Sequence, residues 1–237
     1  EYSFERATIF RSKQSVSEVK RQREMMDEES GNDIKRTFSK PILKRPRFMG
    51  ERALTPAEQG TAMHVVMQQL DLEKPITEQS IMEQLEGLVE KELLTEEEKE
   101  VINVPQIIQF FDTSIGKRML QAKNLKREVP FSASFPASFV YKDWHGEDEH
   151  VLIQGVIDCL FEDEGGLVLL DYKTDRIQGR FKGGIEQAAP ILAKRYEVQL
   201  DLYTRAVEQI LNKKVKEKYL YFFDGGFLVT GTSNVTK

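Results

Sequence analysis

The sequence is poor in cysteine, since Cys159 is the only thiol among its 237 residues. A lone thiol excludes an internal disulfide, and it also excludes a four-cysteine zinc site or iron–sulfur cluster. The segment from Gly155 to Phe161 that surrounds this cysteine is mostly apolar. We therefore expect a buried, inert thiol and no iron–sulfur cluster.

Long hydrophobic runs are absent as well. No apolar segment approaches the roughly 18 residues that a membrane-spanning helix needs, so we expect no membrane span. The first residues, Glu1 to Phe4, show neither an initiator methionine nor the basic-then-apolar pattern of a signal peptide. We expect a segment of a longer cytoplasmic chain.

A strong positive charge is also missing. The net charge of −5 argues against a protein whose whole surface wraps nucleic acid. The distribution is uneven, because residues 1–50 carry 12 Lys and Arg against 8 Asp and Glu, whereas residues 71–100 carry 3 Lys against 11 acids. Either the protein meets DNA on one side only, or these are a solvated tail and a solvated helix face. Charge alone favours the second interpretation.

The local patterns divide the chain into three parts. Residues 1–50 contain basic, proline-punctuated stretches and are expected to form a linker or arm. Residues from about 51 to 124 are expected to be helical, beginning with a helix that Thr55 caps and that runs to about Leu70. The sheet and a long helix should occupy about 125–237. Strands are expected at about 126–135, 138–142, 151–162, 167–173, 218–223 and 227–230, and the long helix at about 191–211. This order predicts an α/β fold with a mixed central sheet flanked by helices.

In two of the expected strands, an acid closes an apolar run. Asp158 and Asp171 each follow an apolar run, and the turn at 163–166 between the strands predicts an antiparallel hairpin that brings the two acids near each other. Two partly desolvated carboxylates repel each other unless a cation lies between them. Mg²⁺, which prefers oxygen ligands, is the natural cation for such a pair.

Lys173 shares a strand face with Asp171, because side chains two residues apart point the same way, and Tyr172 faces away. A metal-binding carboxylate beside an ammonium group suits phosphodiester hydrolysis. The metal activates water, and the lysine stabilises the charge of the transition state. The alternative is an exposed ion pair at a strand end, which the short Asp-x-Lys pattern favours when taken alone.

Four spaced elements together resemble the signature of RecB-type nucleases in the PD-(D/E)xK superfamily. They are Gly60-Thr61-Ala62-Met63-His64, Gly155-Val156-Ile157-Asp158, Leu169-Leu170-Asp171-Tyr172-Lys173-Thr174-Asp175 and Gln199-Leu200-Asp201-Leu202-Tyr203. Each element is weak alone, but their order makes the resemblance specific, and it spans about Gln14 to Phe223. It implies a restriction-endonuclease-like fold, with the nuclease domain at residues 51–237.

The resemblance also implies a metal site. His64, Asp158 and Asp171 would be ligands, and the Tyr172 carbonyl would be a further one. The imidazole suits Mn²⁺ as well as Mg²⁺. Without the motif, His64 would be interpreted as a helix-surface histidine.

Catalytic roles follow from the same resemblance. Lys173 would be the catalytic lysine and would act with Asp158 and Asp171. Gln199 and Tyr203 lie on one helix face and would orient the DNA phosphate or the catalytic groups, although ordinary helix packing is an alternative for Tyr203. A further candidate is Glu128, which either supports the site or is a strand-surface acid.

Three segments resemble one branch of this family, the C-terminal nuclease domains of AddA-type helicase–nucleases. They are Lys13–Arg21, Leu54–Glu58 and Arg127–Phe131. The ATP-binding pattern Gly-x-x-x-x-Gly-Lys-Ser/Thr is absent, so the helicase motor is expected outside this segment. The branch implies a metal-dependent exonuclease that acts at DNA ends during double-strand-break repair by homologous recombination. Its substrate would be single-stranded DNA, on the 3′-ended strand, and its partner an AddB-type protein.

Two other interpretations stay open. A free-standing phage-type exonuclease or a structure-specific endonuclease of the same superfamily would have no helicase motifs in its gene. A catalytically inactive nuclease-fold module would only bind DNA or a partner protein, and would behave alike in Ca²⁺ and Mg²⁺.

Overall fold

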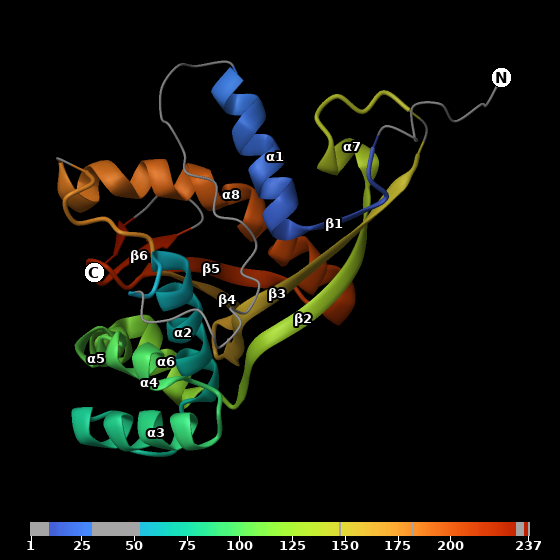
Figure 1. The fold of residues 1–237 in the computed structure, drawn as a ribbon. Coiled ribbons are helices and arrows are strands. Elements are labelled where there is room, and N and C mark those ends of the chain that lie inside the picture. The colour runs from blue at the N-terminus through green and yellow to red at the C-terminus, as the bar shows by residue number, and fades with distance from the viewer. Residues whose placement is uncertain (1–9, 30–52, 147, 182, 231–234, 237) are drawn as a thin grey trace.

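The computed structural model describes residues 10–29, 53–146, 148–181, 183–230 and 235–236, which form a mixed sheet with helices on both faces (Figure 1). The strands are β1 (Lys13–Ser15), β2 (Asn124–Pro136), β3 (His150–Asp163), β4 (Gly166–Lys173), β5 (Val215–Phe222), β6 (Phe227–Thr230) and β7 (Val235–Thr236). The helices are α1 (Val16–Glu29), α2 (Pro56–Gln69), α3 (Glu78–Glu90), α4 (Glu96–Glu100), α5 (Val104–Asp112), α6 (Ser114–Gln121), α7 (Ala137–Val140) and α8 (Gly184–Leu211). The predicted α/β class is confirmed. Among these described residues, no helix is both long and apolar enough to cross a bilayer.

The two acids lie at the point where β3 and β4 stop pairing with each other. The order is β1-β3-β4-β5-β6-β7, and β2 pairs with β3 beside this path. β3 and β4 form the predicted antiparallel hairpin, and β5 lies parallel to β4. The ladder between β3 and β4 ends at the pair Cys159–Leu170, next to Asp158 and Asp171. The earlier part of β3 pairs with β1 instead, so the two acids stand at the point where the neighbours of β3 change.

The sheet separates two hydrophobic cores. Helices α2 to α6 lie below the sheet in the view of Figure 1, and residues such as Met67, Phe110 and Tyr172 are buried in that core. Helices α1 and α8 cover the opposite face, where Val19 and Leu200 are buried. Burial of each such side chain contributes roughly 1.5–3 kcal/mol to stability. Both layers therefore have a core that holds them firmly on the sheet.

The first described segment differs from the expected linker. Residues 13–29 form β1 and α1, and Val16 and Val19 are buried. The Ser15 hydroxyl accepts a hydrogen bond from the Glu18 amide at 3.2 Å, and Glu18 Oε2 accepts one from the Ser15 amide at 2.8 Å. This capping box starts α1 and belongs to the folded domain. The rest of the expected arm, residues 1–9 and 30–50, lies outside the described residues.

Two further predictions were wrong in detail. Residues 138–142 were expected to form a strand, but most of them belong to the short helix α7 that follows Pro136. The long helix begins at Gly184 and not near residue 191, because α8 accommodates Pro190 in its interior. Proline removes a backbone donor and usually breaks a helix, which is why the sequence pattern favoured a later start.

Candidate active site

The centre of the candidate site lies where β3 and β4 separate. Asp158 and Asp171 are buried, with 8% and 1% of their surface exposed. Past the end of the ladder, Asp158 Oδ2 accepts a hydrogen bond of 2.7 Å from the backbone amide of Tyr172. A side-chain carboxylate thus pairs with an amide of the neighbouring strand, and this bond fixes Asp158 beside the end of β4.

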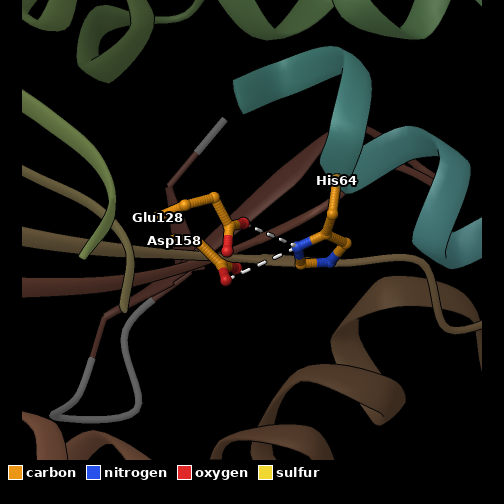
Figure 2. Close-up of side chains that lie close together, drawn as sticks. All are labelled: His64, Glu128 and Asp158. Atoms are coloured by element: carbon orange, nitrogen blue, oxygen red, sulfur yellow. Dashed lines mark ion pairs between the residues drawn. The ribbon is translucent and has the colours of Figure 1, made fainter. Parts of the chain in front are cut away.

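His64 approaches Asp158 from the face of the sheet that α2 to α6 cover. His64 Nδ1, on α2, lies 3.4 Å from Asp158 Oδ1 and 3.8 Å from Glu128 Oε1 (Figure 2). One ligand atom from each of these three residues lies within 4.8 Å of the others. An imidazole and two carboxylates at this spacing match the ligand chemistry of divalent cations such as Mg²⁺ and Mn²⁺.

Glu128 enters this cluster through an irregularity in β2. Its φ is 50°, in the left-handed region that residues other than glycine rarely adopt. The pairing of β2 with β3 passes from Arg127–Cys159 to Val129–Ile157 in one register, and Glu128 and Asp158, which stand opposite each other between these pairs, are not paired. Backbone strain of this kind costs roughly 1–3 kcal/mol and concentrates at functional sites. The Glu128 carboxylate points toward His64, so Glu128 belongs to the same side-chain cluster as His64 and Asp158 (Figure 2).

The cluster controls the charge of its histidine. Burial opposes a positive charge on His64, but hydrogen bonds to Asp158 and Glu128 outweigh burial and raise the pKa of His64 to about 10. Without a cation, the imidazole therefore keeps its proton at neutral pH. Because a metal coordinates only the neutral imidazole, a cation bound here must displace that proton.

Asp171 also has an unusual charge balance. Burial raises the pKa of Asp171 to about 6, and the Asp158 carboxylate adds to the rise, although Lys173 and His64 act against it. A carboxylate whose negative charge is unfavourable gains free energy from a nearby cation. The region of the two acids is thus suited to receive positive charge.

A second cluster lies on the α8 side of the sheet. Lys173 and Asp171 form an ion pair. Gln199 Nε2 donates to Asp171 Oδ1 at 2.9 Å and to the Tyr203 hydroxyl at 3.1 Å. The other end of the amide, Gln199 Oε1, accepts from Lys173 Nζ at 3.2 Å. Gln199 therefore fixes the carboxylate and the ammonium group together, and Tyr203 contacts the site through Gln199.

Tyr172 connects the two clusters through its backbone. Its side chain is buried in the core of α2 to α6, on the face opposite Asp171 and Lys173, as strand alternation predicted. The structure brings His64, Glu128 and Asp158 into one cluster. It places Asp171, Lys173, Gln199 and Tyr203 in the adjoining one.

Arg127 holds the helix that carries His64. Arg127 Nη1 donates to the carbonyl oxygens of Met67 and Leu70 at 3.0 and 2.6 Å, at the C-terminal end of α2. The last carbonyls of a helix lack partners within the helix, so a cation there satisfies them. Arg127 thereby ties α2 to β2, next to Glu128.

The sequence analysis missed one residue near the site. Lys20, on α1, lies with its Nζ 3.6 Å from the centroid of the Tyr196 ring, and Lys173 Nζ lies 4.3 Å from the same centroid. The Ser15-x-x-Glu18 pattern signals the helix that carries Lys20. That signal was hidden by the basic composition of the surrounding residues.

Comparison with known proteins agrees with the motifs. A family model described as the PD-(D/E)XK nuclease superfamily matches residues 38–231. A protein of Bacillus cereus (strain Q1), named as one of the subunits of an ATP-dependent helicase/nuclease, is 53% identical over 229 residues, which are 96% of this chain and 18% of that protein. A protein of the same name from Bacillus thuringiensis (strain Al Hakam) is 52% identical with the same coverage. The chain thus spans 18% of the length of these relatives. The predicted relationship is confirmed, and the chain belongs to the PD-(D/E)XK nuclease superfamily.

Proposed function

We propose that this chain hydrolyses DNA phosphodiester bonds with a bound divalent cation, Mg²⁺ or Mn²⁺. One observation carries the proposal. The ligand atoms of His64, Glu128 and Asp158 lie within 4.8 Å of one another, beside the ion pair of Asp171 and Lys173. A cation site next to a fixed ammonium group is an arrangement that suits phosphodiester hydrolysis.

We assign different roles to the residues of the site. His64, Glu128, Asp158 and Asp171 would hold the cation, with the Tyr172 carbonyl as a further ligand. When bound, the cation supplies Lewis-acid polarisation of a phosphoryl oxygen and lowers the pKa of water.

Lys173 places its ammonium group beside Asp171, where negative charge grows in the transition state. Gln199 holds the ammonium group and the Asp171 carboxylate in one geometry, so neither has to reorganise during the reaction. Tyr203 in turn orients the Gln199 amide.

The resemblance of the three segments to AddA-type nuclease domains leads to a finer proposal. We assign to this domain exonuclease activity on single-stranded DNA, on the 3′-ended strand, during double-strand-break repair by homologous recombination. The helicase motor would belong to the rest of a longer chain, since the relatives' name joins a helicase to a nuclease. An AddB-type protein would be the partner, and the complex would act in the cytoplasm.

The test compares wild type with Asp171→Ala on labelled single-stranded DNA in Mg²⁺ and in Ca²⁺. The matched control is Asp201→Ala, on the same helix motif, where the carboxylate pairs with Lys218 at 2.7 Å and its side chain is 43% exposed. We expect wild type and Asp201→Ala to bind DNA in Ca²⁺ and cut it in Mg²⁺. Asp171→Ala should remain folded and lose cleavage.

Two results would contradict the proposal. If Asp171→Ala cuts at the wild-type rate, the site is wrongly assigned. The second result is a wild type that binds DNA equally in Mg²⁺ and Ca²⁺ and cuts it in neither of them nor in Mn²⁺. The chain would then be an inactive module that binds DNA or a partner protein.

A further inference from the structure

Two ammonium groups share one aromatic ring at the site. Lys20 Nζ lies 3.6 Å and Lys173 Nζ 4.3 Å from the centroid of the Tyr196 ring. The two nitrogen atoms are therefore no farther apart than the sum of these distances. Cations over an aromatic face are attracted by its quadrupole, which explains how the ring holds both groups.

The ring itself is held in a defined position. Tyr196, on α8, is 6% exposed, and its hydroxyl donates to Asp175 Oδ2 at 2.5 Å. Asp175 also lies 3.5 Å from Arg195 Nη1. The Tyr196 ring thus has a fixed position between Lys20 on α1 and Lys173 at the end of β4.

The helix that carries Lys20 is equally well anchored. Val16 and Val19 are buried against the sheet and α8, and Ser15 and Glu18 cap the start of the helix. Arg11 Nη1 contacts Glu18 Oε1 at 2.9 Å and secures the same turn. Lys20 is therefore presented to the site by a packed helix and not by a loose tail.

This placement is unfavourable for a lysine that only stabilises the fold. Burial lowers the pKa of Lys20 to about 8, and the charge of Lys173 lowers it as well, although Glu24, Asp175 and Asp171 act against the fall. Like charges brought together in a partly buried site gain from an anionic ligand. A nucleic acid strand, with one negative charge per phosphate, is such a ligand.

We propose that Lys20 binds the DNA phosphate next to the one that is hydrolysed beside Asp171 and Lys173. The inference rests on the proposed nuclease function. The upper limit on the separation of the two ammonium groups allows them to contact two successive phosphates of one strand, so each lysine serves one phosphate. Lys20 contacts a phosphate that does not react, so its contribution is the same in the ground state and in the transition state. Its loss weakens binding and leaves the chemical step almost unchanged.

The test uses three variants of the whole chain. Lys20→Gln removes the charge and keeps the length, Lys20→Arg keeps the charge, and Lys13→Gln removes the charge of an exposed lysine on the nearby strand β1. Affinity for a single-stranded oligonucleotide is measured by fluorescence anisotropy in Ca²⁺ at several NaCl concentrations. KM and kcat are measured in Mg²⁺, and thermal unfolding is followed for each variant.

We expect Lys20→Gln to raise both Kd and KM by about 10-fold, with kcat within about 3-fold of wild type. The slope of log affinity against log salt should become shallower by about 0.7, which corresponds to one phosphate contact of a single strand. Lys20→Arg should restore affinity and slope, and Lys13→Gln should match wild type.

Three results would overturn the inference. The first is an unchanged affinity, salt slope and KM in Lys20→Gln, which leaves the nuclease assignment standing if wild type cuts DNA. The second is a lower affinity with an unchanged salt slope and a lower melting temperature, which shows a purely structural role. The third is a fall in kcat alone. If wild type does not cut DNA in any cation, the proposed function fails, and the salt slope still decides whether Lys20 binds a phosphate.

Discussion

A Cβ atom on Gly60 would lie 2.6 Å from Thr174 Oγ1. Gly60 is buried in α2, one helical turn before His64, and Thr174 directly follows the last residue of β4. The missing side chain lets α2 come close to the end of β4, and this approach brings His64 within 3.4 Å of Asp158. The spacing of glycine and histidine in the motif therefore has a steric cause.

Gly60→Ala is expected to destabilise the protein. Alanine favours a helix over glycine by about 1 kcal/mol, but the clash with a stiff, β-branched threonine costs about 1–3 kcal/mol and pushes α2 outward. Denaturant unfolding should show a net loss of stability, and cleavage should fall because His64 is displaced.

Gly87→Ala is the control for this substitution. Gly87 lies in α3, and a Cβ atom there would meet nothing within 4 Å. The control should therefore gain up to about 1 kcal/mol. Adding Thr174→Ala should recover part of the loss in Gly60→Ala. If Gly60→Ala is as stable as Gly87→Ala, the steric explanation is wrong.

Gln199→Met should slow the reaction more than Tyr203→Phe does. The methionine keeps the length of the side chain and loses the hydrogen bonds to Asp171, Lys173 and Tyr203, so we expect a fall in kcat of about 10–100-fold. The phenylalanine loses one hydrogen bond and keeps the ring packing against Phe131, so a fall of less than about 10-fold is expected. Steady-state kinetics in Mg²⁺ gives the order. A larger effect of Tyr203→Phe would show that Tyr203 contacts the substrate directly.

The charge of His64 should make stability depend on pH when no metal is bound. The pKa of His64 rises from 6.5 to about 10 on folding, so the folded state holds a proton that the unfolded state has released. The resulting stability is fully present below pH 6.5 and is lost as the pH rises through 10.

The measurement is the difference in unfolding free energy between wild type and His64→Gln in EDTA. We expect this difference to be on the order of 1–3 kcal/mol at low pH and to vanish at high pH. Titrating groups remote from His64 are common to both proteins and cancel, whereas Asp171, whose pKa His64 lowers, adds to the difference only where the pH falls toward about 6. A difference that grows with pH would contradict the sign of the shift.

Arg127→Met should weaken metal binding through α2. The substitution leaves the carbonyls of Met67 and Leu70 without this partner and costs about 1–3 kcal/mol of stability. Because α2 carries His64, calorimetric titration with Mn²⁺ should show a lower affinity.

Arg118→Met is the matched control for Arg127→Met. Arg118 pairs with Asp163 and Glu217, both at 2.7 Å, at the turn end of the β3–β4 hairpin. Its loss should lower stability and leave Mn²⁺ affinity unchanged. Equal affinity in the two variants would show that Arg127 does not position the site.

Much of the site could be predicted from local patterns. The turn between the apolar runs placed Asp158 and Asp171 on one hairpin, and strand alternation separated Tyr172 from Lys173. Hydrophobic periodicity and turn chemistry act over a few residues, so they are visible in one sequence.

The remaining features depend on contacts that are distant in sequence. β1 pairs with β3 across more than a hundred residues, which the basic N-terminal composition does not show. Glu128 lies beside His64 with a positive φ, a conformation that a glutamate in the sequence does not predict. Lys20 lies near the site because α1 packs on α8, beside Tyr196.

The imidazole and the carboxylates of the candidate cation site come from different layers of the molecule. His64 belongs to the helices on one face, whereas Glu128 and Asp158 belong to the sheet (Figure 2). The distances of 3.4 and 3.8 Å that join His64 to the two carboxylates therefore depend on how α2 packs on the sheet, and not on the pairing of the strands alone.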